Sequence, residues 1–343
     1  MPVRFALLGL LCLIASTASG EPNVLPFPGV CDASAAIAVD DKTIIVADDE
    51  SSFLSTYDLE NPELPKKSPI PLAGGEFDLE GAVVLAGRIV WISSYGRSKD
   101  GEAKDGRFQL FASHRIDQAR GRLEEAFSPS FTGLRSLITS SPDPQYGPLA
   151  VAVGVKPEDP DLAPKERGFN VEGVTVRGED LLIGLRNPQV GTKAILFELR
   201  GFQGFLDGRP NELKLGKVIS LDLGGRGVRD IAWSQAHNAY LIIAGPRKDD
   251  DEHPDFALYR WNGDDHAKPA LIDNFADFKP TDHFHPEAVV PLLERSGTEF
   301  IFSRKALVLS DDGTRPMSDG KDCNRKHRPD SERQFRGVVR LIE

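Results

Sequence analysis

Short apolar runs separated by turn residues recur along the whole chain, and four stretches follow the same order of strand, turn and strand. Counting 14 positions on from the start of each copy reaches the end of its second strand every time. The starts are Ser34, Glu80, Glu172 and Asp230, and the ends are Asp48, Ser94, Arg186 and Ala244. A fifth copy begins at 285–288, and its second strand ends near Asp311 after an insertion around 296–305. This regular spacing indicates an internal repeat.

A third strand with alternating polar and apolar residues follows in every copy, and a weaker fourth strand follows in some. Third strands are expected at 53–59, 108–116, 194–199, 256–261 and 337–342, and the clearest fourth strands at 218–223 and 270–273. Units of about four strands that recur every 40 to 60 residues are typical of propeller blades. We therefore predict an all-β chain that forms a β-propeller.

The number of blades depends on one long interval. Glu80 and Glu172 are 92 residues apart, twice the 46 residues from Ser34 to Glu80, so residues 118–168 could hide a degenerate sixth blade. That stretch has no first-strand motif, and 134–139 resembles a short helix. We expect five blades with an insertion at about 118–168, with six blades as the alternative. The last blade lacks a fourth strand, which the extended stretch at 23–27 can supply, leaving no free edge at the seam.

The first 20 residues have the features of a secretory signal peptide, namely Arg4, an apolar stretch at 5–15 and small residues at 18–20. The apolar stretch is too short to span a bilayer, so no stable membrane anchor is expected. We expect residues 21–343 to form one propeller domain, secreted or periplasmic. An oxidising compartment permits a disulfide between Cys31 and Cys323, which would lock the two ends of the ring together. Two free thiols are the alternative.

The net charge narrows the range of partners. A net charge of −11 argues against nucleic-acid binding, which needs basic patches to displace counterions. Hydrophobic residues make up 40 % and charged residues 27 % of the chain, which is ordinary for a globular protein. We expect a folded monomer that binds a small anionic ligand or a partner in the cell envelope.

The first strand of each blade lines the central channel of a propeller, so equivalent positions form rings around it. Stacking the copies predicts one ring of acids, with Ser34 completing it in the first blade, at Glu80, Glu172, Asp230 and Glu287. Further channel acids are expected two residues earlier or at the ends of the second strands, at Asp32, Asp78, Asp48 and Asp311. Acids this close together need a bound cation, shared protons or arginine partners.

Oxygen ligands suit calcium or another hard divalent cation, and we expect Glu80, Glu172 and Glu287 to bind it. Arg97, Arg186 and Arg247 are the candidates for holding an anionic ligand. The alternative is structural: each glutamate would bond backbone amides and hold the blades in register, and each arginine would form an internal ion pair. A zinc site at His283, His285 and Glu287 is a further alternative, since alternate residues of a strand share one face.

Four sequence motifs carry a family resemblance, namely N-V-E-G at 170–173, G-L-R-N-P at 184–188, P-E-A at 286–288 and S-D-D-G at 310–313. At these motifs the chain resembles an exported bacterial family of unknown function, and its D-x-E-G first strand is distantly similar to the esterase-like phytase propellers. The second resemblance implies hydrolysis of a phosphoester or of a lactone. His285 stands where the family has asparagine, so a role for that asparagine does not carry over.

No serine-nucleophile elbow, phosphate-binding loop or zinc-protease motif occurs in the sequence. We therefore expect a metal-assisted hydrolase of an anionic small molecule, in which a cation activates water. The alternative is a propeller without catalytic activity that binds a partner protein or a cell-envelope ligand on one rim.

Overall fold

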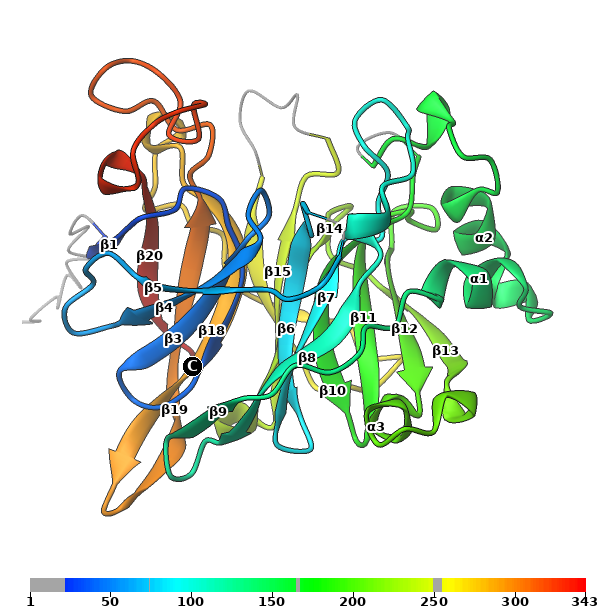
Figure 1. Ribbon diagram of the computed structural model, residues 1–343, viewed down its shortest axis with the longest axis horizontal. Coiled ribbons are helices and arrows are strands. Elements are labelled where there is room, and N and C mark those ends of the chain that lie inside the picture. Colours follow the sequence, from blue (N-terminus) through cyan, green and yellow to red (C-terminus); the bar gives the residue numbers. More distant parts are fainter. Residues whose placement is uncertain (1–21, 74, 165–166, 249–254) are drawn as a thin grey trace, which may run out of the picture.

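Five four-stranded antiparallel sheets form the five blades of a propeller (Figure 1). The computed structural model describes residues 22–73, 75–164, 167–248 and 255–343, so the expected signal peptide at 1–20 lies outside the described residues. Blade 1 consists of β2 (Ala33–Ala38), β3 (Thr43–Asp48), β4 (Phe53–Asp58) and β5 (Lys66–Pro69). Blade 2 consists of β6 (Leu79–Leu85), β7 (Arg88–Ser93), β8 (Leu110–Asp117) and β9 (Arg122–Glu125). Blade 3 consists of β10 (Asn170–Arg177), β11 (Asp180–Asn187), β12 (Ala194–Arg200) and β13 (Lys214–Leu221). Blade 4 consists of β14 (Gly227–Ser234), β15 (Ala239–Gly245), β16 (Ala257–Trp261) and β17 (Ala270–Asp273). Blade 5 consists of β18 (His285–Ser296), β19 (Glu299–Asp311), β20 (Gln334–Leu341) and β1 (Val24–Pro28).

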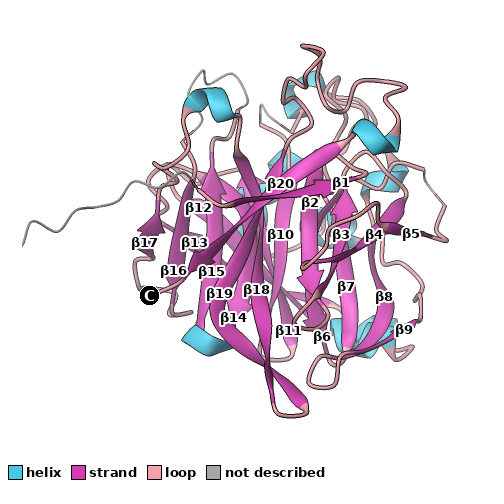
Figure 2. Cartoon of the chain, turned by 90° about the vertical axis from the view of Figure 1, so that its left-hand side faces the viewer, coloured by secondary structure: helices cyan, strands magenta, loops and turns pink. Residues whose placement is uncertain are grey.

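The first strands of the blades form a closed inner ring. Strands β2, β6, β10, β14 and β18 each contact the next in this order, and β18 contacts β2. This closure confirms the predicted five blades and excludes the six-blade alternative. Loops that join second to third strands gather at the top of Figures 1 and 2, while the long β18–β19 hairpin extends from the opposite side.

The predicted closing strand is confirmed, because β1 pairs with β20 and completes the last blade. Phe27 of β1 stacks on Phe335 of β20, with ring centroids 4.9 Å apart, and both rings are buried in the core shared with blade 1. The predicted disulfide is also confirmed: Cys31 is bonded to Cys323, with their Cα atoms 5.8 Å apart. The seam of the ring is therefore held by strand pairing, aromatic packing and one covalent bond.

The insertion forms helices rather than a sixth blade. Helix α1 (Leu134–Thr139) and helix α2 (Gly147–Val153) bury Leu134, Ile138 and Leu149 in the apolar core that joins blades 2 and 3. They lie at the right of Figure 1, outside the sheets, while α3 (Phe202–Leu206) packs beside blade 3. The expected bounds of 118–168 were too wide, because β9 within them is the outer strand of blade 2. No helix in the described part of the chain is long and apolar enough to cross a membrane.

Every inner strand carries a β-bulge near its start, where one residue has no partner on the second strand. The bulge residues are Ser34, Glu80, Glu172, Arg229 and Glu287. In blades 2 and 3 a glycine follows the bulge, because the backbone of the next blade approaches closely there. A Cβ on Gly81 would lie 2.7 Å from the amide nitrogen of Val174, and one on Gly173 would lie 2.9 Å from that of Ile231. The Glu-Gly pair of the repeat is therefore a bulge followed by a point of blade-to-blade contact.

Replacing Gly173 by alanine should lower the free energy of unfolding by about 1–3 kcal/mol, because the new methyl group meets the backbone of blade 4. Urea denaturation monitored by circular dichroism measures the change. Gly147→Ala is the matched control, since a Cβ there has no heavy atom within 4 Å. Equal stability of the two variants would contradict the close approach of blades 3 and 4.

Replacing both Cys31 and Cys323 by serine should lower the free energy of unfolding by about 2–4 kcal/mol, because the bond closes a very long loop in the unfolded chain. Their sequence separation is 292 residues. Reductant should destabilise the wild type by a similar amount and leave the double variant unchanged. A wild type that is insensitive to reductant after complete thiol release would count against this role of the bond.

Candidate functional site

The bulge residues form the predicted ring of the channel, with one correction in blade 4. The structure places Arg229 at the bulge, and Asp230 one position later, beside Gly81 and Gly173 in the equivalent row. Asp230 Oδ1 accepts a hydrogen bond from Ile231 N, and Oδ2 accepts one from Val289 N in blade 5, each 2.7 Å long. Asp230 therefore holds blades 4 and 5 in register. This is the structural role that the sequence analysis offered as the alternative for the channel glutamates.

The one-residue shift of the bulge in blade 4 has a simple geometric cause. The β14–β15 hairpin contains a 3₁₀ turn at Gln235–His237, so the residue before the bulge, Val228, pairs with Ala244. In blade 2 the corresponding residue, Leu79, pairs with Ser93 across a shorter hairpin. Counting back a fixed distance from the end of the second strand therefore reaches the bulge in blade 2 and the next residue in blade 4.

On one side of the channel, the charges of blades 3, 4 and 5 form a paired network. Arg229 Nε donates to Glu287 Oε2 over 2.6 Å, and Arg229 Nη2 donates to the other oxygen of the same carboxylate. Glu172 accepts hydrogen bonds from Asn170 and from Arg186 Nη1, the latter over 3.5 Å, and its Oε2 lies 3.4 Å from Arg229 Nε. Two arginines and two glutamates thus neutralise one another in a site where Glu172 is only 2 % exposed.

On the other side, the acids of blades 1 and 2 lack such compensation. These acids form two groups, and within each group the carboxylate oxygens lie within 4.8 Å of one another. Asp32, Asp48 and Asp49 form the first group, and Asp49, Asp78 and Glu80 form the second, so Asp49 belongs to both. We call these five residues the acidic cluster. Within the described chain, only Asp78 among them has an arginine at ion-pair distance, with Arg107 Nη1 3.0 Å away. The buried Oδ1 atom of Asp49 has no hydrogen-bond partner among the described residues.

Burial and mutual repulsion make the acidic cluster hard to ionise. Burial, together with the charges of Asp311 and Asp48, raises the pKa of Asp32 to about 9. Burial raises the pKa of Asp48 and that of Asp78 to about 6. The pKa values of Asp49 and Glu80 are raised well above the ordinary range by burial and by neighbouring carboxylates. A bound cation would offset the repulsion between these carboxylates and stabilise their ionised forms.

Local structure aims these acids at one another. Asp78 has a left-handed backbone with φ of 50°, which aspartate tolerates better than most residues, and its carboxylate accepts a hydrogen bond from Ser94. Asp48 ends β3, where its Oδ1 accepts a 3.1 Å hydrogen bond from the amide of Glu50. Asp32 precedes β2 and accepts a 3.1 Å hydrogen bond from Asn324 Nδ2, a residue of the long loop before β20. Three separate chain segments therefore fix the cluster.

The three arginines predicted to bind an anion have different positions. Arg97 is 2 % exposed, and its two Nη atoms donate to backbone carbonyl oxygens, those of Gly101, Pro157, Val153 and Lys156. These bonds tie the insertion to the loop after β7 and give Arg97 a structural role. Arg186 belongs to the paired network, and its Nε donates over 3.1 Å to the carbonyl oxygen of Arg247, whose side chain is exposed.

The predicted metal ligands are not brought together as one set. Glu80 belongs to the acidic cluster, whereas Glu172 and Glu287 are paired with arginines. Asp311 lies nearby, since its charge raises the pKa of Asp32, and its Oδ1 accepts a 2.8 Å hydrogen bond from Gly313 N. His283 and His285 belong to neither carboxylate group of the described chain.

Sequence reasoning missed Asp49 and Arg229. The Asp-Asp pair at 48–49 was a usable signal for Asp49, because the repeat already placed its neighbour Asp48 among the channel acids. Arg229 was hidden by the one-residue offset in blade 4.

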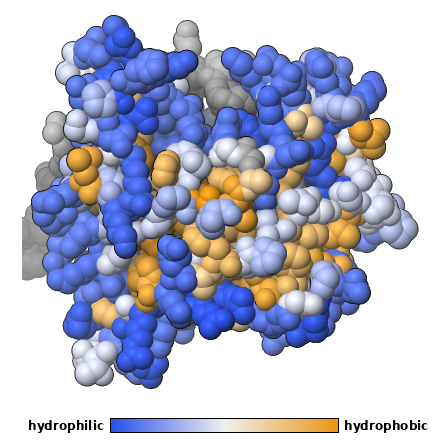
Figure 3. Space-filling view, viewed as in Figure 1, coloured by the Kyte–Doolittle hydropathy of each residue, from blue (hydrophilic) through white to orange (hydrophobic). Residues whose placement is uncertain are grey.

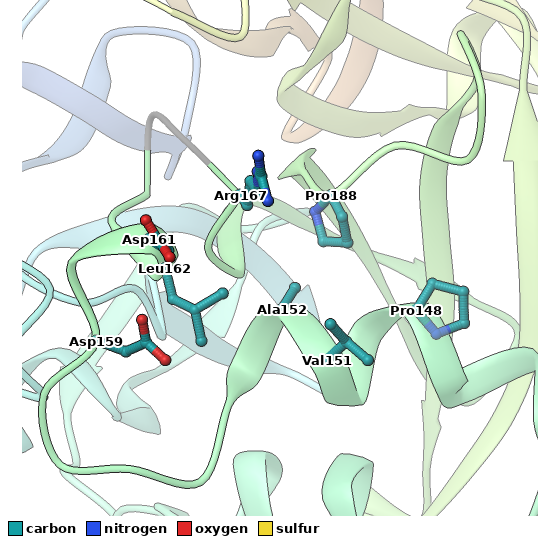
Figure 4. Close-up of a pocket in the computed structure, with 8 residues that line it drawn as sticks. All are labelled: Pro148, Val151, Ala152, Asp159, Asp161, Leu162, Arg167 and Pro188. Atoms are coloured by element: carbon teal, nitrogen blue, oxygen red, sulfur yellow. The ribbon is translucent and has the colours of Figure 1, made fainter.

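A pocket of about 420 Å³ lies apart from the acidic cluster, between α2, the segment 159–162, Arg167 and Pro188 (Figure 4). Figure 4 shows Val151, Ala152 and Leu162 towards its middle, with Asp159 and Asp161 on the loop at one side. None of the channel acids lines it. The space-filling view shows mainly hydrophilic residues over the top loops and apolar residues over the middle of the same face (Figure 3).

The comparisons with known proteins concern the fold more than the chemistry. The family model described as "Protein of unknown function (DUF3616)" matches residues 149–283. This span contains the motifs at 170–173 and 184–188 but not those at 286–288 and 310–313. No curated protein matches the chain.

Solved propellers resemble the chain only distantly. Glutaminyl cyclase of Myxococcus xanthus is 9 % identical with a TM-score of 0.43, covering 93 % of this chain and 96 % of its own. The PQQ-bound aldose sugar dehydrogenase of Streptomyces coelicolor is 12 % identical with a TM-score of 0.40, covering 93 % and 100 %. Virginiamycin B lyase of Staphylococcus aureus is 11 % identical with a TM-score of 0.34, covering 94 % and 100 %. These likenesses carry no argument about function.

Replacing Glu172 by glutamine should lower the free energy of unfolding by about 3 kcal/mol or more, because it removes one partner of a buried charge network. Thermal and urea denaturation measure the loss. Glu60→Gln is the matched control, because the ion pair of Glu60 with Lys42 is exposed, with side-chain exposures of 66 % and 45 %. This change should alter the free energy of unfolding by less than about 1 kcal/mol. Similar small effects for both variants would show that the network does not stabilise the ring.

Proposed function

We propose that the protein binds a divalent cation at the acidic cluster and uses it to hydrolyse an anionic small molecule. The observation that carries this proposal is the pair of carboxylate groups that share Asp49, whose buried Oδ1 has no hydrogen-bond partner in the described chain. A buried carboxylate oxygen without a donor is costly, and a cation satisfies it together with its neighbours. The ligand set is thereby revised from the predicted Glu80, Glu172 and Glu287 to Glu80 with four aspartates.

The chemistry of the cluster favours a hard cation. All five side chains offer oxygen, as calcium and magnesium require, and no cysteine or histidine of the described chain joins either group. Calcium accepts the larger and less regular coordination that acids from three chain segments offer. When bound, such a cation would polarise a substrate oxygen and lower the pKa of a coordinated water. Asp78, held by Ser94 and Arg107, and Asp48, held by the backbone, would keep the ligands in place.

Export of the protein is part of the same proposal. The disulfide between Cys31 and Cys323 fits an oxidising compartment, and calcium is available outside the cell. For the substrate class we propose a phosphoester or a lactone, which is what the predicted resemblance to phytase propellers implies. A propeller without catalytic activity that binds a partner on its rim is the outcome if the experiments below fail.

Asp49→Asn should abolish the stabilisation of the protein by calcium, because it removes the charge shared by both carboxylate groups. A hundredfold excess of calcium over its Kd should stabilise the wild type by about 2.7 kcal/mol, and a chelator should reverse the effect. Glu124→Gln, an exposed change in β9, is the control of equal charge. Activity against phosphomonoesters, lactones and aryl esters is then measured with calcium and with chelator. A wild type that melts at the same temperature with calcium and with chelator would rule out the cation site. Calcium binding without any turnover would favour the alternative of a propeller that binds a partner without catalytic activity.

The metal-free protein should become less stable as the pH rises from about 5 to about 9. The raised pKa values of Asp32, Asp48 and Asp78 mean that the folded state holds protons that the unfolded state has already released, since unfolded aspartates ionise near pH 4. Raising the pH therefore favours unfolding until the folded groups have ionised. Saturating calcium should weaken or reverse this trend, because it binds the ionised form. Urea denaturation at pH 5, 7 and 9, with calcium and with chelator, measures both slopes, and equal slopes would contradict the site.

A further inference from the structure

Arg229 has an unusual position among the bulge residues. The other four bulges carry serine or glutamate, and blade 4 alone places a positively charged side chain in this ring. Arg229 is 8 % exposed, and its Nε and Nη2 are occupied by Glu287. Its third nitrogen, Nη1, is buried and has no hydrogen-bond partner within the described part of the chain. A buried guanidinium nitrogen with two unused N–H groups needs an acceptor.

Arg229 lies between the paired network and the acidic cluster, because its strand β14 contacts both β10, which carries Glu172, and β6, which carries Glu80. Burial and the charge of Arg186 lower the pKa of Arg229 to about 10, against the opposing effects of Glu172, Glu80 and Asp311. Its charge in turn lowers the pKa of Glu80, against the larger effects of burial and of neighbouring acids. Within the described chain Arg229 forms no ion pair with an acid of the cluster, and its Nη1 is the nitrogen left to bind a further group.

We propose that Arg229 Nη1 binds the phosphate group of a ligand, one oxygen of which is also bound by the cation at the acidic cluster. This inference rests on the proposed cation site and adds the ligand class and a ligand-binding residue. Neither Arg97 nor Arg247 provides this contact, since the first is engaged by backbone carbonyls and the second is exposed.

A phosphate group fits this arrangement better than a carboxylate does. Its tetrahedral oxygens point in different directions, so one can face the cation and another can accept from Nη1. Its two negative charges match a divalent cation on one side and a guanidinium on the other. The orientation of Arg229 is fixed before binding, because Glu287 holds its Nε–Nη2 edge through two hydrogen bonds. Such preorganisation lowers the entropic cost of binding the ligand.

The test uses the whole protein, saturated with calcium, and methylphosphonate as a soluble mimic of a phosphate ester. Isothermal titration should show methylphosphonate binding to the wild type with calcium and at least tenfold weaker binding without it. Arg229→Lys keeps a positive charge beside Glu287 but has one nitrogen in place of three and none equivalent to Nη1. It should weaken methylphosphonate binding at least tenfold while calcium affinity changes less than threefold. Glu124→Gln should match the wild type in both titrations.

A second variant covers the case in which Arg229→Lys does not fold. Replacing Arg229 and Glu287 together by glutamine removes both charges of the pair, so no buried charge is left unpaired, and it should lose methylphosphonate binding in the same way. Calcium binding with unchanged methylphosphonate affinity in either variant would overturn the role of Arg229 and leave the cation site standing. Acetate binding as tight as methylphosphonate would overturn the phosphate class. A wild type that binds no calcium would overturn the proposed function and this inference together.

Discussion

The close approach of the inner strands around the channel is the constraint on which the rest of the molecule depends. Backbone atoms of the next blade lie 2.7 Å and 2.9 Å from where a Cβ of Gly81 or Gly173 would be, so at these two points the strands pack with no side chain between them. A bulge directly before each contact turns one side chain per blade out of the strand pairing. The same geometry that closes the ring therefore also selects which residues meet in the channel, and five blades bring five such residues into one row.

This row creates an electrostatic problem that the two sides of the channel solve differently. In blades 3 to 5, Arg186 and Arg229 compensate Glu172 and Glu287, and the network is neutral. In blades 1 and 2, the acids gather around Asp49 with one arginine beside Asp78. Carboxylates in this position store protons or bind a cation, because the folded backbone fixes them closer together than ionised groups would settle in water. The channel is therefore asymmetric, with a paired charge network on one side and largely uncompensated acids on the other.

The seam and the insertion protect this arrangement from outside the channel. Strand β1, the disulfide and the Phe27–Phe335 stack join the ends of the chain beside blade 1, which supplies three of the cluster acids. The insertion helices add apolar core between blades 2 and 3, and Arg97 ties their loop to the strand end beside Ser94. Parts of the chain that carry none of the proposed chemistry thus fix the distances between the parts that do.

The sequence by itself predicted the repeat, the closing strand and the Cys31–Cys323 pair, because these follow from local periodicity and from the two ends of a closed ring. It favoured five blades, but only the structure excluded a sixth blade and two free thiols. It also identified most of the acids, since Asp32, Asp48, Asp78 and Glu80 occupy repeat positions. Only the tertiary structure decided which charges neutralise one another. Arg229, and not the predicted Asp230, occupies the bulge of blade 4, and this register cannot be deduced from where the strands end. The hydrogen bonds of Arg97 reach carbonyl groups up to 60 positions along the chain, and Asp49 joins the acidic cluster because its carboxylate lies beside those of blade 1 and of blade 2. Periodicity is a property of neighbouring residues, whereas charge pairing is set by distances that exist only after the ring has closed.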